Sequence, residues 1–259
     1  MYRTQLKKWA NFINIKSPYT YIKSLYYMET ASLFLFVSQK IIKSPNFITF
    51  LYALTGVTGA FLLNSSHEML FYVGIFMVFT KGTFDWADGP LARRLNKTSF
   101  LGHALDEYGA YLSDAALRLS FIYYTFKYFP ELMHLFPIIA FLLLVKKFNL
   151  FSDYIYFKNI VRNSSIKDKK SLNNRFQKLI KDSENSTGIS KWYYRYIAFL
   201  DARARSIDFL LLLLIIDRFV DYYVSEVLLT FSVLIVLRAM SMYLAGIYLD
   251  FKVYKTDSY

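Results

Sequence analysis

Long apolar runs alternate with short polar and basic stretches along most of this chain. A helix needs about 20 mainly apolar residues to cross a bilayer. The apolar runs predict six membrane-spanning helices, at 48–63, 69–86, 100–128, 135–145 with an extension to 156, 207–216 and 227–249. Upstream, residues 21–42 carry Lys23, Glu29 and Lys40 among many aromatic side chains, which favours a helix lying in the membrane interface; a seventh crossing is the alternative. The predicted fold class is all-α, a polytopic membrane protein with six transmembrane helices plus an N-terminal interfacial helix.

This pattern divides the chain into three parts. Residues 1–43 form an N-terminal cytoplasmic and interfacial segment, 44–251 the six-helix membrane domain, and 252–259 a C-terminal tail. Within the membrane domain, the polar stretch 158–205 is predicted to be a basic cytoplasmic loop. The sequence leaves open whether its basic residues face anionic lipid headgroups or only solvent.

Basic residues are distributed unevenly between the connections. The chain has 31 Lys and Arg against 19 Asp and Glu, a net charge of +12. They concentrate before the first span, at 93–97, in 158–205 and in the tail, whereas the connections at 127–134 and 217–226 hold one each. Because cytoplasmic loops carry the excess of Lys and Arg, we expect both termini to be cytoplasmic. Positive charge between apolar runs indicates an anionic membrane surface and phosphate-bearing ligands as partners, and argues against nucleic acid.

The composition narrows the kinds of metal site that the chain could build. It has no cysteine and three histidines, so disulfides and thiolate-bound metals are excluded. A metal site here must rely on carboxylate oxygens, which suit magnesium, calcium or manganese better than zinc.

Three acids are predicted to meet where the second and third spans approach each other. Asp85 and Asp88 are three positions apart and share a helix face, and Asp106 follows on the next helix. Acids within a membrane helix are costly, so their default interpretation is functional. Carboxylates can hold a hard divalent cation that neutralises the oxygens of a diphosphate. Beside them, Gly89 and Ala92 leave room for a flat base and a ribose.

The spacing of these residues resembles the motif of the CDP-alcohol phosphotransferase (CDP-alcohol phosphatidyltransferase) family, D-x2-D-G-x2-A-R-x8-G-x3-D-x3-D. The chain supplies matching residues at Asp85, Asp88, Gly89, Ala92, Arg93, Gly102 and Asp106. The preceding segment SPNFITFLYAL at 44–54 also resembles the P-N-x-I-T opening of the family's first span. The resemblance covers residues 44–120 well and the later spans only by hydropathy.

This resemblance implies an enzyme of phospholipid biosynthesis that is often a homodimer and whose metal site opens to the cytoplasm. Such an enzyme transfers a phosphatidyl or phospho-headgroup moiety from a CDP-linked donor to an alcohol and releases CMP, with Mg²⁺ or Mn²⁺ as cofactor. CDP-diacylglycerol with a small polar alcohol is the expected substrate pair; a CDP-linked headgroup with diacylglycerol is the reverse arrangement. By position, the metal ligands are Asp85, Asp88 and Asp106, and the residues that hold the CDP moiety are Gly89, Ala92 and Arg93.

The chain departs from the motif at its last acid, where Ala110 stands in place of the family's general base. Asp114 lies one turn further on the same helix face, about 5.4 Å along the axis, and is the predicted substitute base. Glu107 is the other nearby acid, about 100° around an ideal helix from Asp106. Three interpretations remain: an active natural variant, a residue replaced to trap a complex, and an inactive relative that binds CDP-lipid without turnover.

Three arginines outside the motif are candidate substrate contacts. Arg238 lies within the last apolar run, and we expect it either in the acceptor pocket or in a structural pair. Arg203 and Arg205 open the fifth span, where they contact phosphate or anchor the helix at the headgroups. Lys81, one turn before the motif, contacts the substrate or pairs with Asp85; the sequence does not decide between these roles.

Overall fold

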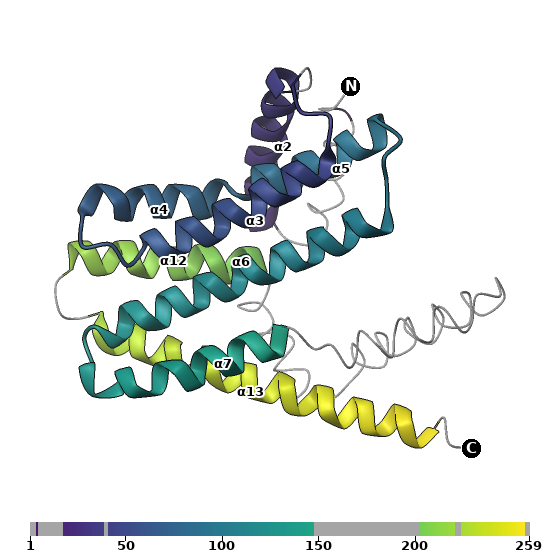
Figure 1. Ribbon diagram of the computed structural model, residues 1–259. Helices are drawn as coiled ribbons and strands as arrows, with labels where there is room; N and C mark the ends of the chain where they lie inside the picture. Colours follow the sequence, from purple (N-terminus) through teal and green to yellow (C-terminus); the bar gives the residue numbers. More distant parts are fainter. Residues whose placement is uncertain (1–3, 5–17, 39–40, 148–202, 221–223, 257–259) are drawn as a thin grey trace.

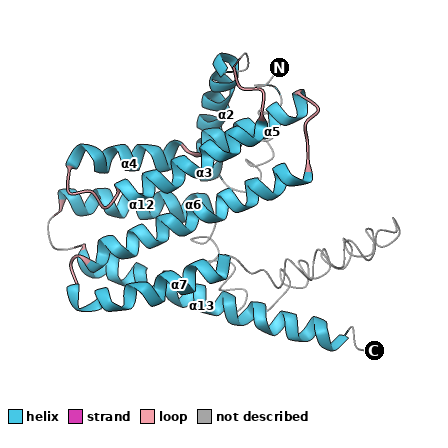
Figure 2. Ribbon diagram, viewed as in Figure 1, coloured by secondary structure: helices cyan, strands magenta, loops and turns pink. Residues whose placement is uncertain are grey.

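The structure, a computed structural model, describes residue 4 and residues 18–38, 41–147, 203–220 and 224–256. These residues form helices and no strands (Figure 2), so the all-α prediction is confirmed for the described part of the chain. The helices are α2 (Pro18–Ser38), α3 (Pro45–Leu62), α4 (Glu68–Thr80), α5 (Gly82–Arg94), α6 (Phe100–Phe126), the 3₁₀ helix η1 (Pro130–Leu135), α7 (Phe136–Lys147), α12 (Arg203–Phe219) and α13 (Ser225–Thr256). The predicted loop lies outside the described residues up to 202, as does the predicted extension of the fourth span to 156.

The second predicted span is two helices. The run at 69–86 is divided at Lys81 into α4 and α5. Among the described helices, only α3 is both long and apolar enough to cross a membrane by length and composition. Helix α4 does not meet this criterion because it is short, and α6 carries several charged side chains. The six-span count therefore stays a prediction.

The main core lies between α3, α4, α6, α7, α12 and α13 (Figure 1). Its largest fully buried side chains include Phe71, Phe121 and Leu214, which come from three different helices. The outward faces are also apolar: Phe61 is 81% exposed and Phe76 65%. Exposed apolar surface on this scale is unusual for a water-soluble monomer and marks a surface that contacts protein or lipid.

Helix α2 runs across the direction of the other helices and covers the junction of α4 and α5 (Figure 1). Gly82 begins α5 directly against the Tyr27 ring, where a Cβ atom would collide with the ring carbons. The Tyr27 hydroxyl donates to the Phe79 carbonyl at 2.8 Å. The hydroxyl oxygens of Thr30 and Thr83 lie 2.9 Å apart. The break between α4 and α5 is therefore held by α2, a helix distant in sequence.

Candidate functional site

The turn between α5 and α6 places the motif acids of the two helices opposite each other. Asn96 adopts a left-handed φ of 52°, which Asn tolerates better than most residues and which reverses the chain direction. The Ser99 hydroxyl then accepts a hydrogen bond from the Gly102 amide at 3.0 Å, so α6 begins at Phe100 with a capped first turn. Lys97 donates to the Lys43 carbonyl at 3.1 Å, which fastens the turn to the chain just before α3.

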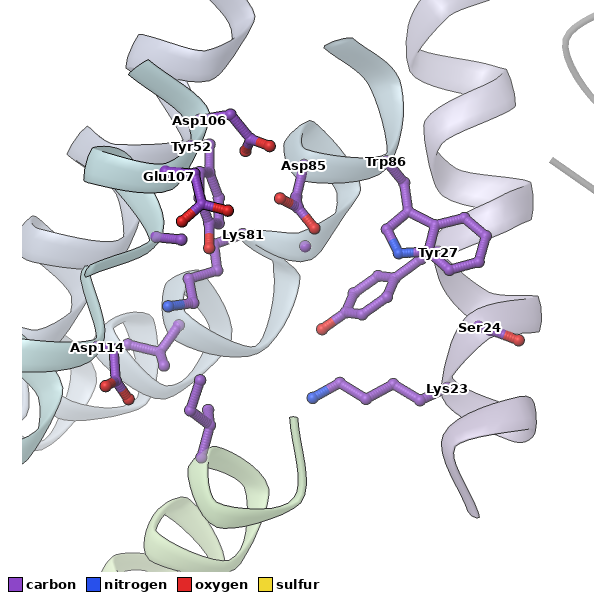
Figure 3. A pocket seen from close by; sticks show the side chains of 14 residues that line it. Lys23, Ser24, Tyr27, Tyr52, Lys81, Asp85, Trp86, Asp106, Glu107 and Asp114 are labelled. Carbon is purple, nitrogen blue, oxygen red and sulfur yellow. The ribbon is translucent and has the colours of Figure 1, made fainter. Parts of the chain in front are cut away.

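Asp85 and Asp106 face each other across the gap between α5 and α6 (Figure 3). Three charged groups lie close enough to exert an electrostatic effect on the Asp85 carboxyl group. The effect of Asp106 is the largest, followed by those of Asp88 and Lys81. Asp88 accepts a hydrogen bond from the Thr49 hydroxyl of α3 at 2.8 Å. The structure thus brings Asp85 and Asp106 together, and Asp88 is held by α3.

The two facing acids line a cavity of about 230 Å³ that opens between α2, the α4–α5 junction, α6 and the start of α12 (Figure 3). Four acidic side chains contribute to its wall, together with two lysines and three large aromatic side chains. These are Asp85, Asp106, Glu107, Asp114, Lys23, Lys81, Tyr27, Tyr52 and Trp86. Ala110 also lines it, so the position where the family motif has its last acid opens onto this space.

The chemistry of the cavity acids fits a hard divalent cation. Within the described ranges, no three His, Cys, Asp or Glu side chains gather tightly enough to form a complete metal site by themselves. Magnesium is usually held in proteins by one or two carboxylates, with waters and substrate phosphates completing its octahedron. Asp85 and Asp106 match that arrangement, in which the substrate supplies the missing ligands.

The predicted CDP-binding residues lie on the same helix as Asp85 but outside the cavity wall. Gly89 and Arg93 are one turn apart on α5, and the Arg93 Nη1 atom lies 3.2 Å from the place a Cβ atom on Gly89 would take. A side chain at position 89 would push the guanidinium aside. Arg93 is exposed and Ala92 half-buried. The three residues form one short surface that continues from the carboxylates towards the end of α5.

Asp114, the predicted substitute base, is held by its own helix. Both of its carboxylate oxygens accept from the Arg118 Nε, at 3.1 and 3.2 Å, and its side chain is buried. This pairing gives the buried guanidinium a counter-charge. Asp114 reaches the cavity wall, and it is also one partner of a buried ion pair.

The candidate substrate arginines differ in how the structure places them. Arg238 is half-buried on α13. It is not among the described residues that line the cavity. Arg203 and Arg205 lie in the first turn of α12, with side chains outside the described part of the structure. Ile207, one helical turn further, reaches the cavity wall.

Sequence reasoning missed the wall of the cavity that α2 supplies. The Lys23 ammonium forms an ion pair with Asp208 of α12, and both side chains are nearly buried. Burial lowers the pKa of Lys23, while the charge of Asp208 opposes that shift. A lysine one turn before Tyr27 within an aromatic stretch was the available signal, but its partner lies far away in sequence. Lys81 donates to the buried Ser113 hydroxyl and lies 5.5 Å from the centre of the Tyr52 ring.

The central part of the chain matches a known protein family. Residues 42–166 match the model of the CDP-alcohol phosphatidyltransferase family, so the chain carries a domain of that family, whose members transfer phosphorus-containing groups. This match confirms the resemblance seen in the motif. The chain matches no curated protein and no solved structure.

Proposed function

We propose that the protein transfers a phosphatidyl or phospho-headgroup moiety from a CDP-linked donor to an alcohol and releases CMP. The observation that supports this most directly is the facing pair Asp85 and Asp106 on the wall of a small cavity. The pair lies within the segment that matches the phosphatidyltransferase family. Phosphoryl transfer depends mainly on positioning and on stabilising charge, and this cavity provides fixed charged groups for both.

A bound Mg²⁺ or Mn²⁺ ion would neutralise charge on the diphosphate as the leaving phosphate departs. Asp85 and Asp106 would hold it, with Asp88 as a third carboxylate positioned by Thr49. Arg93 would bind a donor phosphate through its planar nitrogens, and Gly89 and Ala92 would leave room beside it for the cytidine.

The size of the cavity indicates which part of the substrates it holds. Pockets that enclose drug-sized ligands usually measure about 300–1,000 Å³. A cavity of about 230 Å³ is large enough for a small polar alcohol and the reacting phosphate, but not for lipid chains. We therefore expect the acyl chains to lie along the exposed apolar helix faces. CDP-diacylglycerol with a small alcohol fits this division better than the reverse arrangement.

The proposed setting is a membrane. The exposed large apolar side chains of α3, α4, α7 and α13 would contact lipid, and α2, which runs across the direction of the other helices, would lie in the interface. In this arrangement the α5–α6 turn with Arg93, Arg94 and Lys97 is on the cytoplasmic side, as the positive-inside rule requires. Six spans, cytoplasmic termini and a homodimer remain predictions that accompany this proposal.

The decisive experiment measures CMP release by the full-length protein in liposomes. CDP-diacylglycerol is offered with a panel of alcohols, including inositol phosphate, glycerol phosphate, serine and choline, with and without Mg²⁺ or Mn²⁺. Metal-dependent CMP release with one acceptor supports the proposal. A parallel assay with CDP-linked headgroups and diacylglycerol tests the reverse arrangement.

A second candidate is an inactive family member that binds CDP-lipid without turnover. Ala110 favours it, because the wall of the cavity lacks the motif's last acid and Asp114 is occupied by Arg118. Metal-dependent binding of CDP without CMP release under all acceptor conditions would support this candidate.

A further inference from the structure

The proposed transfer requires a group that accepts a proton. The alcohol oxygen that attacks phosphorus loses its hydrogen, and a carboxylate positioned within hydrogen-bond reach is a suitable acceptor. Four carboxylates line the cavity: Asp85, Asp106, Glu107 and Asp114. Their contacts divide them into those committed to another partner and those open to a substrate.

Three of the four carboxylates are committed. Asp85 and Asp106 face each other and form the pair that would hold the cation. Asp114 is 2% exposed and binds Arg118 through both oxygens. Protonating Asp114 would remove the counter-charge that it gives to the buried guanidinium, which is unfavourable.

Glu107 is the remaining carboxylate. It is exposed, it lines the cavity, and it makes no hydrogen bond or ion pair with the described part of the chain. Glu107, Ala110 and Asp114 are spaced three and four apart on α6 and so lie along one side of the helix. Figure 3 shows the Glu107 side chain beside Asp106, while the Asp114 carboxylate lies away from the facing pair. The longer stem of Glu107 can cover the space that the small Ala110 side chain leaves.

We propose that Glu107 is the general base of the transfer, in the place that an acid at position 110 would otherwise take. The inference rests on the proposed function. The acceptor oxygen forms a bond to the donor phosphorus as the bond from phosphorus to the CMP oxygen breaks. The electron pair of that bond leaves with CMP, and the hydroxyl proton passes to the Glu107 carboxylate and then to water.

The test compares variants of the full-length protein in liposomes with Mg²⁺, CDP-diacylglycerol and the alcohol that the wild type accepts. Two quantities are measured for each variant: the rate of CMP release and the affinity for CDP. Glu107→Gln should slow CMP release about 10²–10⁴-fold, the usual contribution of a general base, with CDP affinity unchanged. The matched control is Glu131→Gln, an exposed acid of η1 outside the cavity wall, which should keep the wild-type rate.

Two further variants separate a base from a merely structural residue. Glu107→Asp keeps a carboxylate and should retain more activity than Glu107→Gln. Adding Ala110→Asp to Glu107→Gln should restore part of the rate, because it returns an acid to the same side of the cavity.

A wild-type rate in Glu107→Gln would overturn the proposal, as would a parallel loss of CDP affinity and rate. Both of these outcomes leave the proposed function intact, since the wild type still releases CMP. Absence of CMP release by the wild type with every acceptor and metal would instead remove the proposed function and the base together.

Discussion

Acidic side chains lie in apolar surroundings at both ends of the helix bundle, but the groups that contact them differ between the two ends. At the end away from the cavity, Asp217 of α12 is 3% exposed and accepts hydrogen bonds from the Tyr124 and Tyr128 hydroxyls at 2.8 and 2.7 Å. At the cavity, Asp85 and Asp106 face each other. A buried carboxylate with donors in place is complete without a ligand, whereas two facing carboxylates repel until a cation joins them. Partner groups, more than burial itself, therefore separate a structural acid from a functional one.

Asp114 tests this distinction most severely, because it lines the cavity yet has a structural partner. Asp114→Asn should destabilise the protein by about 3–5 kcal/mol, since it breaks a buried ion pair by removing the charge of one partner. Denaturation in detergent measures this. The double variant Asp114→Leu with Arg118→Met should be more stable than Asp114→Asn. A stable Asp114→Asn protein that has lost CMP release would place Asp114 among the functional acids.

Asp85→Asn should have the opposite profile. CMP release should fall about a hundredfold or more, because the cation that Asp85 would help to hold supplies several kcal/mol of charge stabilisation. Stability should be unchanged or higher, since the substitution removes repulsion from Asp106. The assay is CMP release at increasing Mg²⁺, paired with a thermal midpoint. Marked destabilisation without loss of activity would show that Asp85 resembles Asp217.

Asp217→Asn examines the structural end directly. It replaces a charged acceptor of two phenol hydroxyls with a neutral one and should cost about 1–3 kcal/mol of stability. CMP release per folded molecule should stay at the wild-type rate. A changed affinity for CDP or Mg²⁺ would show that the two ends are coupled, contrary to the division drawn above.

Thr49→Val gives the smallest expected effect. It removes the hydroxyl that donates to Asp88 at 2.8 Å, and loss of such a supporting contact typically weakens metal binding about tenfold. The Mg²⁺ concentration needed for half-maximal CDP binding measures the change. Thr58→Val on the same helix is the matched control, because its hydroxyl donates to the Leu54 and Thr55 carbonyls of its own helix. Equal shifts in both variants would mean that Thr49 does not position Asp88 for the metal.

Local sequence pattern predicted some helices well, although it did not predict the division of the run at 69–86 into α4 and α5. The runs at 48–63 and 100–128 correspond closely to α3 and α6, because apolar length and the capping residues at Ser44–Pro45 and Ser99 act within a few positions. The acids of the motif could also be located, since fixed spacing on adjacent helices leaves little freedom.

Contacts between helices that are distant in sequence could not be predicted from local pattern. The break at Lys81 depends on Gly82 meeting Tyr27, a contact between helices whose pairing no local pattern encodes. Asp114 was favoured over Glu107 on helix angle alone, which could not reveal that Arg118 already binds it. The part played by Lys23 depends on Asp208, 185 positions later in the chain.

The part of the cavity wall that α2 and α12 contribute has a practical consequence for choosing the ends of an expressed fragment. The family match spans 42–166, yet Lys23 and Tyr27 precede it and Ile207 follows it. A fragment trimmed to the matched segment would keep every residue of the motif and lose the parts of the cavity wall that α2 and α12 supply. The segment that matches the family is thus shorter than the part of the chain that forms the cavity. Fragments for expression should contain all of the residues that line the cavity.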